Sequence, residues 1–209
     1  MKYFICFFFT AAGMLSSLCC FAQNHADCDS AYRVCDKKRL HFIGQSGEGA
    51  DKDEAFASCF ENGELVGNPE KNSVWLRFDI GEGGTVSFAI MPDTLTDDID
   101  FVVFTLPLTG DCKYKRSIRC MAAGDTQESA RISPCMGATG LRDDEKDEKE
   151  DAGCNDKGDN NWLMPLKVKA GEKYALLVSN TTSPYNGFKI RFGGTATFAC
   201  DAAEEAQKE

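Results

Sequence analysis

Residues 74–90, VWLRFDIGEGGTVSFAI, contain the pattern that decides the fold. Apolar side chains occupy every second position in 74–80 and again in 86–90. Successive side chains of a strand point to opposite faces of a sheet, so this alternation predicts two strands, each with one buried face. The glycine-rich turn at 81–84 between them predicts a β-hairpin.

The same alternation recurs toward the C-terminus of the chain. It covers 164–168, 174–178, 188–192 and 196–198, with turn residues or glycines between the runs. Residues 99–106, IDFVVFTL, are apolar at nearly every position, which is typical of a central strand with both faces buried. Many short strands and almost no helical periodicity predict an all-β fold, a disulfide-rich antiparallel β-sandwich that is jelly-roll-like.

The composition is that of one globular domain, with a cysteine content typical of proteins in an oxidising compartment. The chain has 209 residues, of which 43% are hydrophobic, and it carries a net charge of -10 and eleven cysteines. So many cysteines are typical of exported proteins and argue against a cytosolic enzyme. An acidic chain also does not favour nucleic acid as a partner, because phosphates attract basic surfaces.

The beginning of the chain predicts export. Lys2 precedes a hydrophobic run over 3–18, and residues 20–22 have the small-x-small pattern of a cleavage site. The alternative is a transmembrane anchor, but the run is near the lower length limit for spanning a bilayer and no basic stop-transfer signal follows it. We expect no transmembrane span after cleavage, and a protein that is periplasmic, surface-attached or secreted. The predicted divisions are a signal peptide over 1–22, a single β-sandwich domain over 23–200 with an acidic loop over 142–160, and an acidic flexible tail over 201–209.

Cleavage would leave an even number of cysteines, which predicts up to four disulfides among Cys28, Cys35, Cys59, Cys112, Cys120, Cys135, Cys154 and Cys200. Short spacing favours Cys112 with Cys120 first, and Cys135 with Cys154 would close the acidic segment. The other four would share the remaining bonds. Zinc is the alternative, but the chain has no C-x-x-C pair and only two histidines.

Negative charge is concentrated in two segments. Residues 142–160 hold nine acidic and four basic residues, and the tail over 201–209 is also acidic. Neither segment has a hydrophobic period, so we interpret the first as a solvated loop and the second as a frayed end. The alternative is a loop that attracts cations or a partner.

Several short motifs occur in a characteristic order: EKNSVWLRF at 70–78, GTVSF at 84–88, DDIDF at 97–101, AGEKY at 170–174 and NGF at 186–188. This order resembles a β-sandwich module of exported Bacteroidota proteins. This module is similar in turn to the pre-peptidase C-terminal and collagen-binding domains of secreted enzymes, and the likeness covers about 28–198. It implies a noncatalytic module of the kind appended to surface adhesins or hydrolases.

Asp98 and Asp100 form a candidate calcium site. Alternation along a strand places their side chains on the same face, and Ca²⁺ prefers such oxygen ligands. Calcium sites built from loop carboxylates are known in the modules that the chain resembles, and this resemblance adds Glu70 and Asn72 as ligands. The alternative is that Asp97 and Asp98 cap a turn and that Asp100 bonds to neighbouring backbone.

No catalytic motif is present, since G-x-S-x-G, H-E-x-x-H and a phosphate loop are all absent from the sequence. We therefore predict no enzyme, but an exported binding module, adhesin-like or an accessory subunit of a cell-envelope complex, that recognises a protein or glycan. Aromatic candidates for this binding are Tyr114, Trp162 and Tyr185. The alternative is a hydrolase accessory domain or a weakly defined hydrolase.

Overall fold

The structure, a computed structural model, describes residues 25–43, 49–52, 54–55, 58–61, 70, 72–126, 128–129, 131–154 and 157–200. The predicted signal peptide and acidic tail lie outside these residues.

Sheet A contains, in order, β1 (Tyr32–Arg33), β3 (Ser73–Glu82), β11 (Lys173–Asn180), β5 (Ile99–Leu106), β6 (Arg116–Ala123) and β8 (Lys149–Gly153), with β13 (Thr197–Ala199) on β3. Sheet B contains β2 (Leu40–Phe42), β12 (Phe188–Gly193), β4 (Gly84–Pro92), β7 (Thr139–Leu141) and β9 (Trp162–Leu163), with β10 (Leu166–Val168) on β4.

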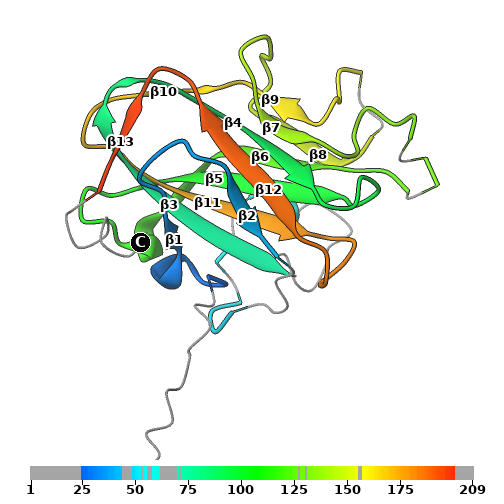
Figure 1. Cartoon of the computed structure of the whole chain (residues 1–209), viewed down its shortest axis with the longest axis horizontal. Coiled ribbons are helices and arrows are strands. Elements are labelled where there is room, and N and C mark those ends of the chain that lie inside the picture. Colours follow the sequence, from blue (N-terminus) through cyan, green and yellow to red (C-terminus); the bar gives the residue numbers. More distant parts are fainter. Residues whose placement is uncertain are drawn as a thin grey trace, which may run out of the picture.

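The two sheets pack face to face, and β12 and β4 lie across the strands of sheet A in Figure 1. Alternate apolar side chains of both sheets form one buried core, among them Phe78, Phe88, Phe101 and Phe192. This confirms the predicted disulfide-rich all-β sandwich. In the part of the chain that the structure describes, helical structure is confined to three 3-10 turns, η1 (Cys28–Ser30), η2 (Cys59–Glu61) and η3 (Cys112–Tyr114), and no helix is long and apolar enough to cross a membrane.

Most strand pairs are antiparallel, as predicted, but each sheet also contains parallel pairing. Strand β1 runs parallel to β3, β8 runs parallel to β6, and β9 runs parallel to β7. In each case a long connection brings the chain back in the same direction, which parallel pairing requires.

The predicted hairpin at 74–90 is also wrong, because β3 and β4 belong to different sheets. Residues 81–84 carry the chain from one layer to the other. Gly83 passes so close to β10 that a Cβ atom there would lie 2.9 Å from the carbonyl oxygen of Val168. Alternation reports only that a strand has one buried face, and a crossing between layers produces the same pattern as a hairpin.

Strand β5 is central, as predicted, and lies between β11 and β6. Phe101 and Val103 face the core between the sheets, whereas Val102 and Phe104 face a second cluster on the outer side of sheet A. Ala55 and Phe60 cover that second cluster. Both faces of β5 are therefore buried, which explains its uninterrupted apolar run.

All eight predicted cysteines form disulfides: Cys28–Cys112, Cys35–Cys200, Cys59–Cys120 and Cys135–Cys154. The predicted Cys135–Cys154 bond is confirmed. The predicted Cys112–Cys120 bond is wrong, because Cys112 lies in η3 and Cys120 lies well inside β6. An extended strand advances about 3.3 Å per residue, so the part of β6 that precedes Cys120 holds its sulfur away from the sulfur of Cys112. Each instead bonds to a segment that covers the outer face of sheet A.

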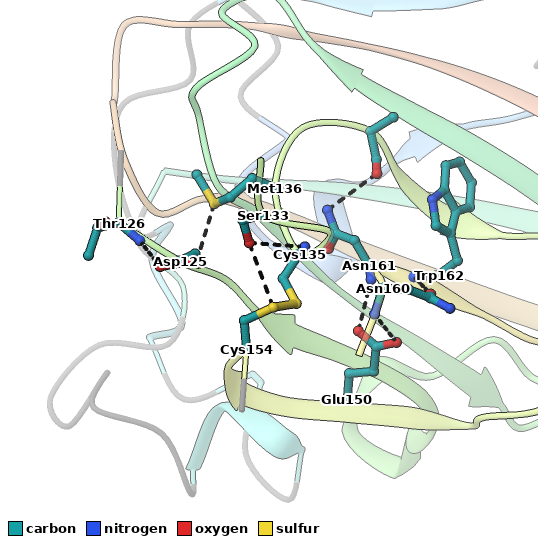
Figure 2. Close-up of a disulfide and its surroundings, with 11 residues drawn as sticks. Asp125, Thr126, Ser133, Cys135, Met136, Glu150, Cys154, Asn160, Asn161 and Trp162 are labelled. Carbon is teal, nitrogen blue, oxygen red and sulfur yellow. Dashed lines mark hydrogen bonds between the residues drawn. A yellow bond between two sulfur atoms is a disulfide. The ribbon is translucent and has the colours of Figure 1, made fainter. Parts of the chain in front are cut away.

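Within 142–160, predicted to be a solvated loop, residues 149–153 instead form a strand, although most described side chains of the segment are exposed. Strand β8 pairs with β6 at the edge of sheet A. The buried carboxylate of Glu150 accepts hydrogen bonds from the backbone N–H groups of Asn160 and Asn161, both at 3.0 Å (Figure 2). Backbone pairing and one buried carboxylate order this segment without the apolar period that sequence analysis relies on.

Candidate functional site

Asp98 and Asp100 lie where β5 begins, beside the end of β11. Asp100 is opposite Ser179, and its side chain is almost fully buried, with 2% of its surface exposed. Asp98 rests on Gly124, where an added Cβ would lie 2.1 Å from the Oδ2 atom of Asp98. The Oδ1 atoms of both aspartates are buried and have no hydrogen-bond partner in the described part of the chain. Each of these two carboxyl groups thus has one buried oxygen without a partner, and Asp100 is enclosed whereas Asp98 is partly exposed.

These two carboxyl groups open onto a pocket of about 690 Å³ that Asp125, Thr181 and Cys154 also line. Burial, with a contribution from the charge of Asp125, raises the pKa of Asp98 to about 7. Burial and the charge of Asp98 raise the pKa of Asp100 well above its ordinary value. Figure 2 shows Asp125 near the Cys135–Cys154 disulfide. Such a pair can share a proton or bind a cation.

The structure does not bring the other predicted calcium ligands to this pair. The charges that act on Glu70 come mainly from Glu54 and Lys115, and burial raises the pKa of Glu70 to about 8. The side-chain amide of Asn72 donates to the carbonyl oxygen of Asn180 at 3.0 Å. Among the described residues, no three acidic, cysteine or histidine side chains gather as a metal-binding group. The set predicted as one calcium site is therefore divided, and only Asp98 and Asp100 remain together.

The buried carboxylate of Asp97 bonds to distant side chains rather than to neighbouring backbone. Its Oδ2 atom accepts hydrogen bonds from the side-chain amides of Asn180, at 3.0 Å, and Asn186, at 2.8 Å. These bonds tie the connection between β4 and β5 to the connection between β11 and β12. The two connections are thereby held as one rigid unit beside the carboxyl pair.

Large apolar side chains are exposed on four connections at this same end of the sandwich, which we call the loop end. They are Ile43, Leu95, Ile132 and Tyr185, with 74%, 67%, 89% and 83% of their surface exposed. Strand directions place these connections at the same end, because β2, β4, β6 and β11 all finish there. Gly187 lies against the Cα atom of Ile43, and Gly137 lies against the carbonyl oxygen of Leu95.

The three predicted aromatic binding residues lie in three separate places. Tyr185 belongs to the loop end. Tyr114 lies in η3 after β5, and β5 runs antiparallel to β11, so Tyr114 is at the opposite end of sheet A. Trp162 lies in β9 at the edge of sheet B, with the guanidinium of Arg142 5.0 Å from its ring centre.

Sequence reasoning did not select Leu95 and Ile132, although their signal is present in the sequence. Each is a lone large apolar residue inside a turn-rich stretch, PDTLTDD at 92–98 and ARISPC at 130–135. A turn has no buried face to receive such a side chain, so an isolated one there indicates exposure.

Comparison of the chain with family models and with curated proteins finds no match. The fold and its bonds define the class of protein, which is a two-sheet β-sandwich cross-linked by four disulfides. The resemblance to pre-peptidase C-terminal and collagen-binding modules stays a prediction.

Proposed function

We propose that this protein is an exported, noncatalytic binding module that docks a protein of the cell envelope on its loop end. The observation that supports this proposal is the exposure of four large apolar side chains, Ile43, Leu95, Ile132 and Tyr185, on four neighbouring connections. Contiguous exposed apolar surface is typical of protein interfaces, and tyrosine is enriched in them.

Two further features favour this role. The hydrogen bonds of Asp97 fix two of the four connections to each other, so little conformational freedom would be lost when a partner binds. Four disulfides are typical of proteins that work in an oxidising compartment, such as the periplasm or the cell surface. An adhesin-like protein and an accessory subunit of an envelope complex would both use such a surface.

The test is retention of an envelope protein by the immobilised exported domain. The wild type and Leu108→Ser, which removes an exposed side chain at the opposite end of sheet A, should retain the same stoichiometric partner. The triple variant Leu95→Ser, Ile132→Ser and Tyr185→Ser should lose it while it melts at the same temperature. Retention by the triple variant would overturn the proposal. Turnover of a substrate that persists through purification to homogeneity would instead support the hydrolase alternative.

A second candidate function is calcium binding by Asp98 and Asp100. The buried, unpartnered Oδ1 atoms favour it, because burial without a counterion raises the energy of both carboxylates. The two side chains would supply part of the six to eight oxygen ligands that Ca²⁺ takes, and backbone oxygens or water would supply the rest. The bound ion would neutralise the pair and fix the start of β5.

A further inference from the structure

The outer face of sheet B carries an ordered row of side chains that the proposed function does not use. Arg191 of β12 is opposite Ala89 of β4, Ala89 is opposite Gly140 of β7, and Gly140 is opposite Trp162 of β9. Neighbouring strands lie about 4.8 Å apart, so the row is about 14 Å long. It has a large side chain at each end and almost none in the middle.

The middle of the row is necessarily flat. Gly140 adopts φ 145°, and a Cβ atom there would lie 2.1 Å from the carbonyl oxygen of Phe88. No larger residue fits this position. A surface hollow of about 460 Å³ follows the row, with Ala89, Arg191, Trp162, Arg142 and Asp143 among its lining residues. We call this hollow the sheet B trough.

Positive charge gathers at the β12 end of the trough. The register of β2 against β12 pairs Leu40 with Ile190, and the next step places Arg39 opposite Arg191. Both arginines are exposed, and in the described part of the chain neither makes an ion pair or a hydrogen bond. Together with Lys37 and Lys38, they line a second hollow that adjoins the trough at Arg191.

Two like charges placed directly opposite each other on neighbouring strands are destabilising unless a counterion joins them. In a chain of net charge -10, acidic side chains are abundant, yet no acidic side chain in the described part of the chain forms an ion pair with either arginine. Arginine presents a planar fork of N–H donors that matches a carboxylate or a sulfate with two parallel hydrogen bonds. The pair is therefore suited to an external anion.

The opposite end of the trough is aromatic. Trp162 is half-buried, and Arg142 lies over its ring while it is paired with Glu145 and Asp144. The charge of Arg142 is thus already balanced within the protein, and its role is to fix the tryptophan. An indole fixed in this way offers apolar surface to the carbon-bound hydrogens of a sugar ring.

The trough runs across the interior strands β12, β4 and β7 to the edge strand β9, and the interior strands favour a saccharide over an extended peptide. Strands β12, β4 and β7 each have a neighbour on both sides, so their backbone groups are already paired. A peptide that binds in extended form adds to an exposed sheet edge, where backbone groups are free. Along the interior strands only side chains are offered, and arginines at one end with an aromatic ring at the other fit an acidic oligosaccharide.

We propose that the sheet B trough binds an acidic polysaccharide, with Arg39 and Arg191 on its carboxylate or sulfate groups and Trp162 against a sugar ring. This surface is separate from the loop end, so the two sites can fail independently. Asp143 also lines the trough and would weaken the binding of an anion. Removing the charge of Arg39 or Arg191 should therefore weaken the binding of an anion, and removing the charge of Asp143 should strengthen it.

The test is calorimetric titration of the disulfide-bonded protein with galacturonic acid hexamer. Arg191→Gln and Arg39→Gln should each weaken binding at least tenfold, and Trp162→Ala should do the same. Asp143→Asn should tighten binding severalfold. The matched control is Arg116→Gln, which removes an exposed arginine from sheet A and should leave the affinity unchanged within twofold.

Comparison ligands separate the chemistry from simple charge attraction. Cellohexaose, which is neutral, and hexaglutamate, which is acidic but not a sugar, should each bind at least tenfold more weakly than the galacturonic acid hexamer. Equal affinity for hexaglutamate, or no effect of Arg191→Gln in a protein that melts normally, would overturn the proposal, and so would no binding of the hexamer. The loop-end triple variant should bind the hexamer like the wild type, whatever happens to its protein partner.

Discussion

The two tryptophans lie on the outer faces of the two sheets, and their surroundings differ sharply. Trp75, on sheet A, is fully buried beneath a cluster that includes Phe60, with Lys115 above its ring at 5.5 Å. Trp162, on sheet B, also has a cation above its ring, but no segment of the described chain closes over it. Two disulfides, Cys28–Cys112 and Cys59–Cys120, fasten the cover of sheet A.

This difference shows how to distinguish an outer face that must be covered for stability from an outer face that stays open to a ligand. In β5 the apolar residues run on without alternation, and in β3 Trp75 adds a large apolar side chain to the outer face, so this part of sheet A must be covered to be stable. In β4 and β12 polar or small residues alternate with apolar ones, so the outer face of sheet B is stable in water. An outer face that needs no cover is free to bind a ligand.

The largest expected effect is on the covered tryptophan. Trp75→Ala should lower the free energy of unfolding by about 3–5 kcal/mol, because it leaves a cavity between sheet A and its cover. Trp162→Ala should cost less than about 1 kcal/mol, since that side chain is half exposed. Urea denaturation of both variants gives the two values. Similar losses would show that the two outer faces do not differ in this way.

The acidic segment extends the comparison to the edge of sheet A. Glu150→Ala should destabilise the protein by about 1–3 kcal/mol, because it leaves the backbone N–H groups of Asn160 and Asn161 without their acceptor. Asp151→Ala, which removes an exposed carboxylate from the same strand, is the matched control and should change stability by less than about 0.5 kcal/mol. If both variants melt like the wild type, β8 contributes no stability and the segment behaves as a solvated loop.

The carboxyl pair at the loop end should make stability depend on pH. The pKa of Asp98 is raised from 3.8 to about 7, so the folded protein keeps a proton that the unfolded chain loses above about pH 4. The free energy of unfolding should therefore fall as pH rises from about 4 to 7 in the absence of calcium. Asp98→Asn with Asp100→Asn should remove most of this fall and should be more stable than the wild type at pH 8 by about 1–3 kcal/mol. Thermal melts across this range, with chelator, provide the measurement.

At pH 8, calcium should restore the stability that the wild type loses when Asp98 and Asp100 are ionised. An ion that binds only the folded state stabilises it by roughly 2.7 kcal/mol at a hundredfold excess over Kd. The melting temperature should rise with added CaCl2, and the rise should vanish in the Asp98→Asn, Asp100→Asn variant. If chelated and calcium-loaded wild type melt together, the two carboxyl groups share a proton and bind no calcium.

The smallest effect on stability is expected at the arginine pair. Arg39→Gln should leave stability unchanged or raise it by about 0.2–1 kcal/mol, because it removes a like charge opposite Arg191. A loss of more than about 1 kcal/mol would mean that the arginines hold sheet B together and are not a site for an external anion.

Sequence patterns predicted the strands but not their partners. Alternation in 74–80, 86–90 and 188–192 follows directly from burial of one face, so those strands are where the sequence placed them. Which sheet receives a strand depends on contacts between distant segments, and therefore the hairpin at 74–90 and the Cys112–Cys120 bond were wrong. The apolar pattern also missed β8, whose order comes from backbone pairing and Glu150.

The candidate site, like the fold, was predictable only where it depends on residues that are close in sequence. Asp98 and Asp100 are two residues apart on one strand, so alternation alone placed them together. Glu70 comes from another part of the chain, and nothing local reports that its neighbours are Glu54 and Lys115. The sheet B trough is a row across four strands, so it is visible only once their register is known.

The measurement that tests the central claim most directly is an NMR titration of the ¹⁵N-labelled, disulfide-bonded protein with galacturonic acid hexamer. The claim is that the covered face of sheet A is structural and the bare face of sheet B binds a ligand. Backbone amide shifts should then change at Ala89, Gly140, Trp162 and Arg191, while those of Trp75 and Ala175 stay constant. Shifts that change mainly on sheet A, or no change on sheet B at saturating hexamer, would contradict it.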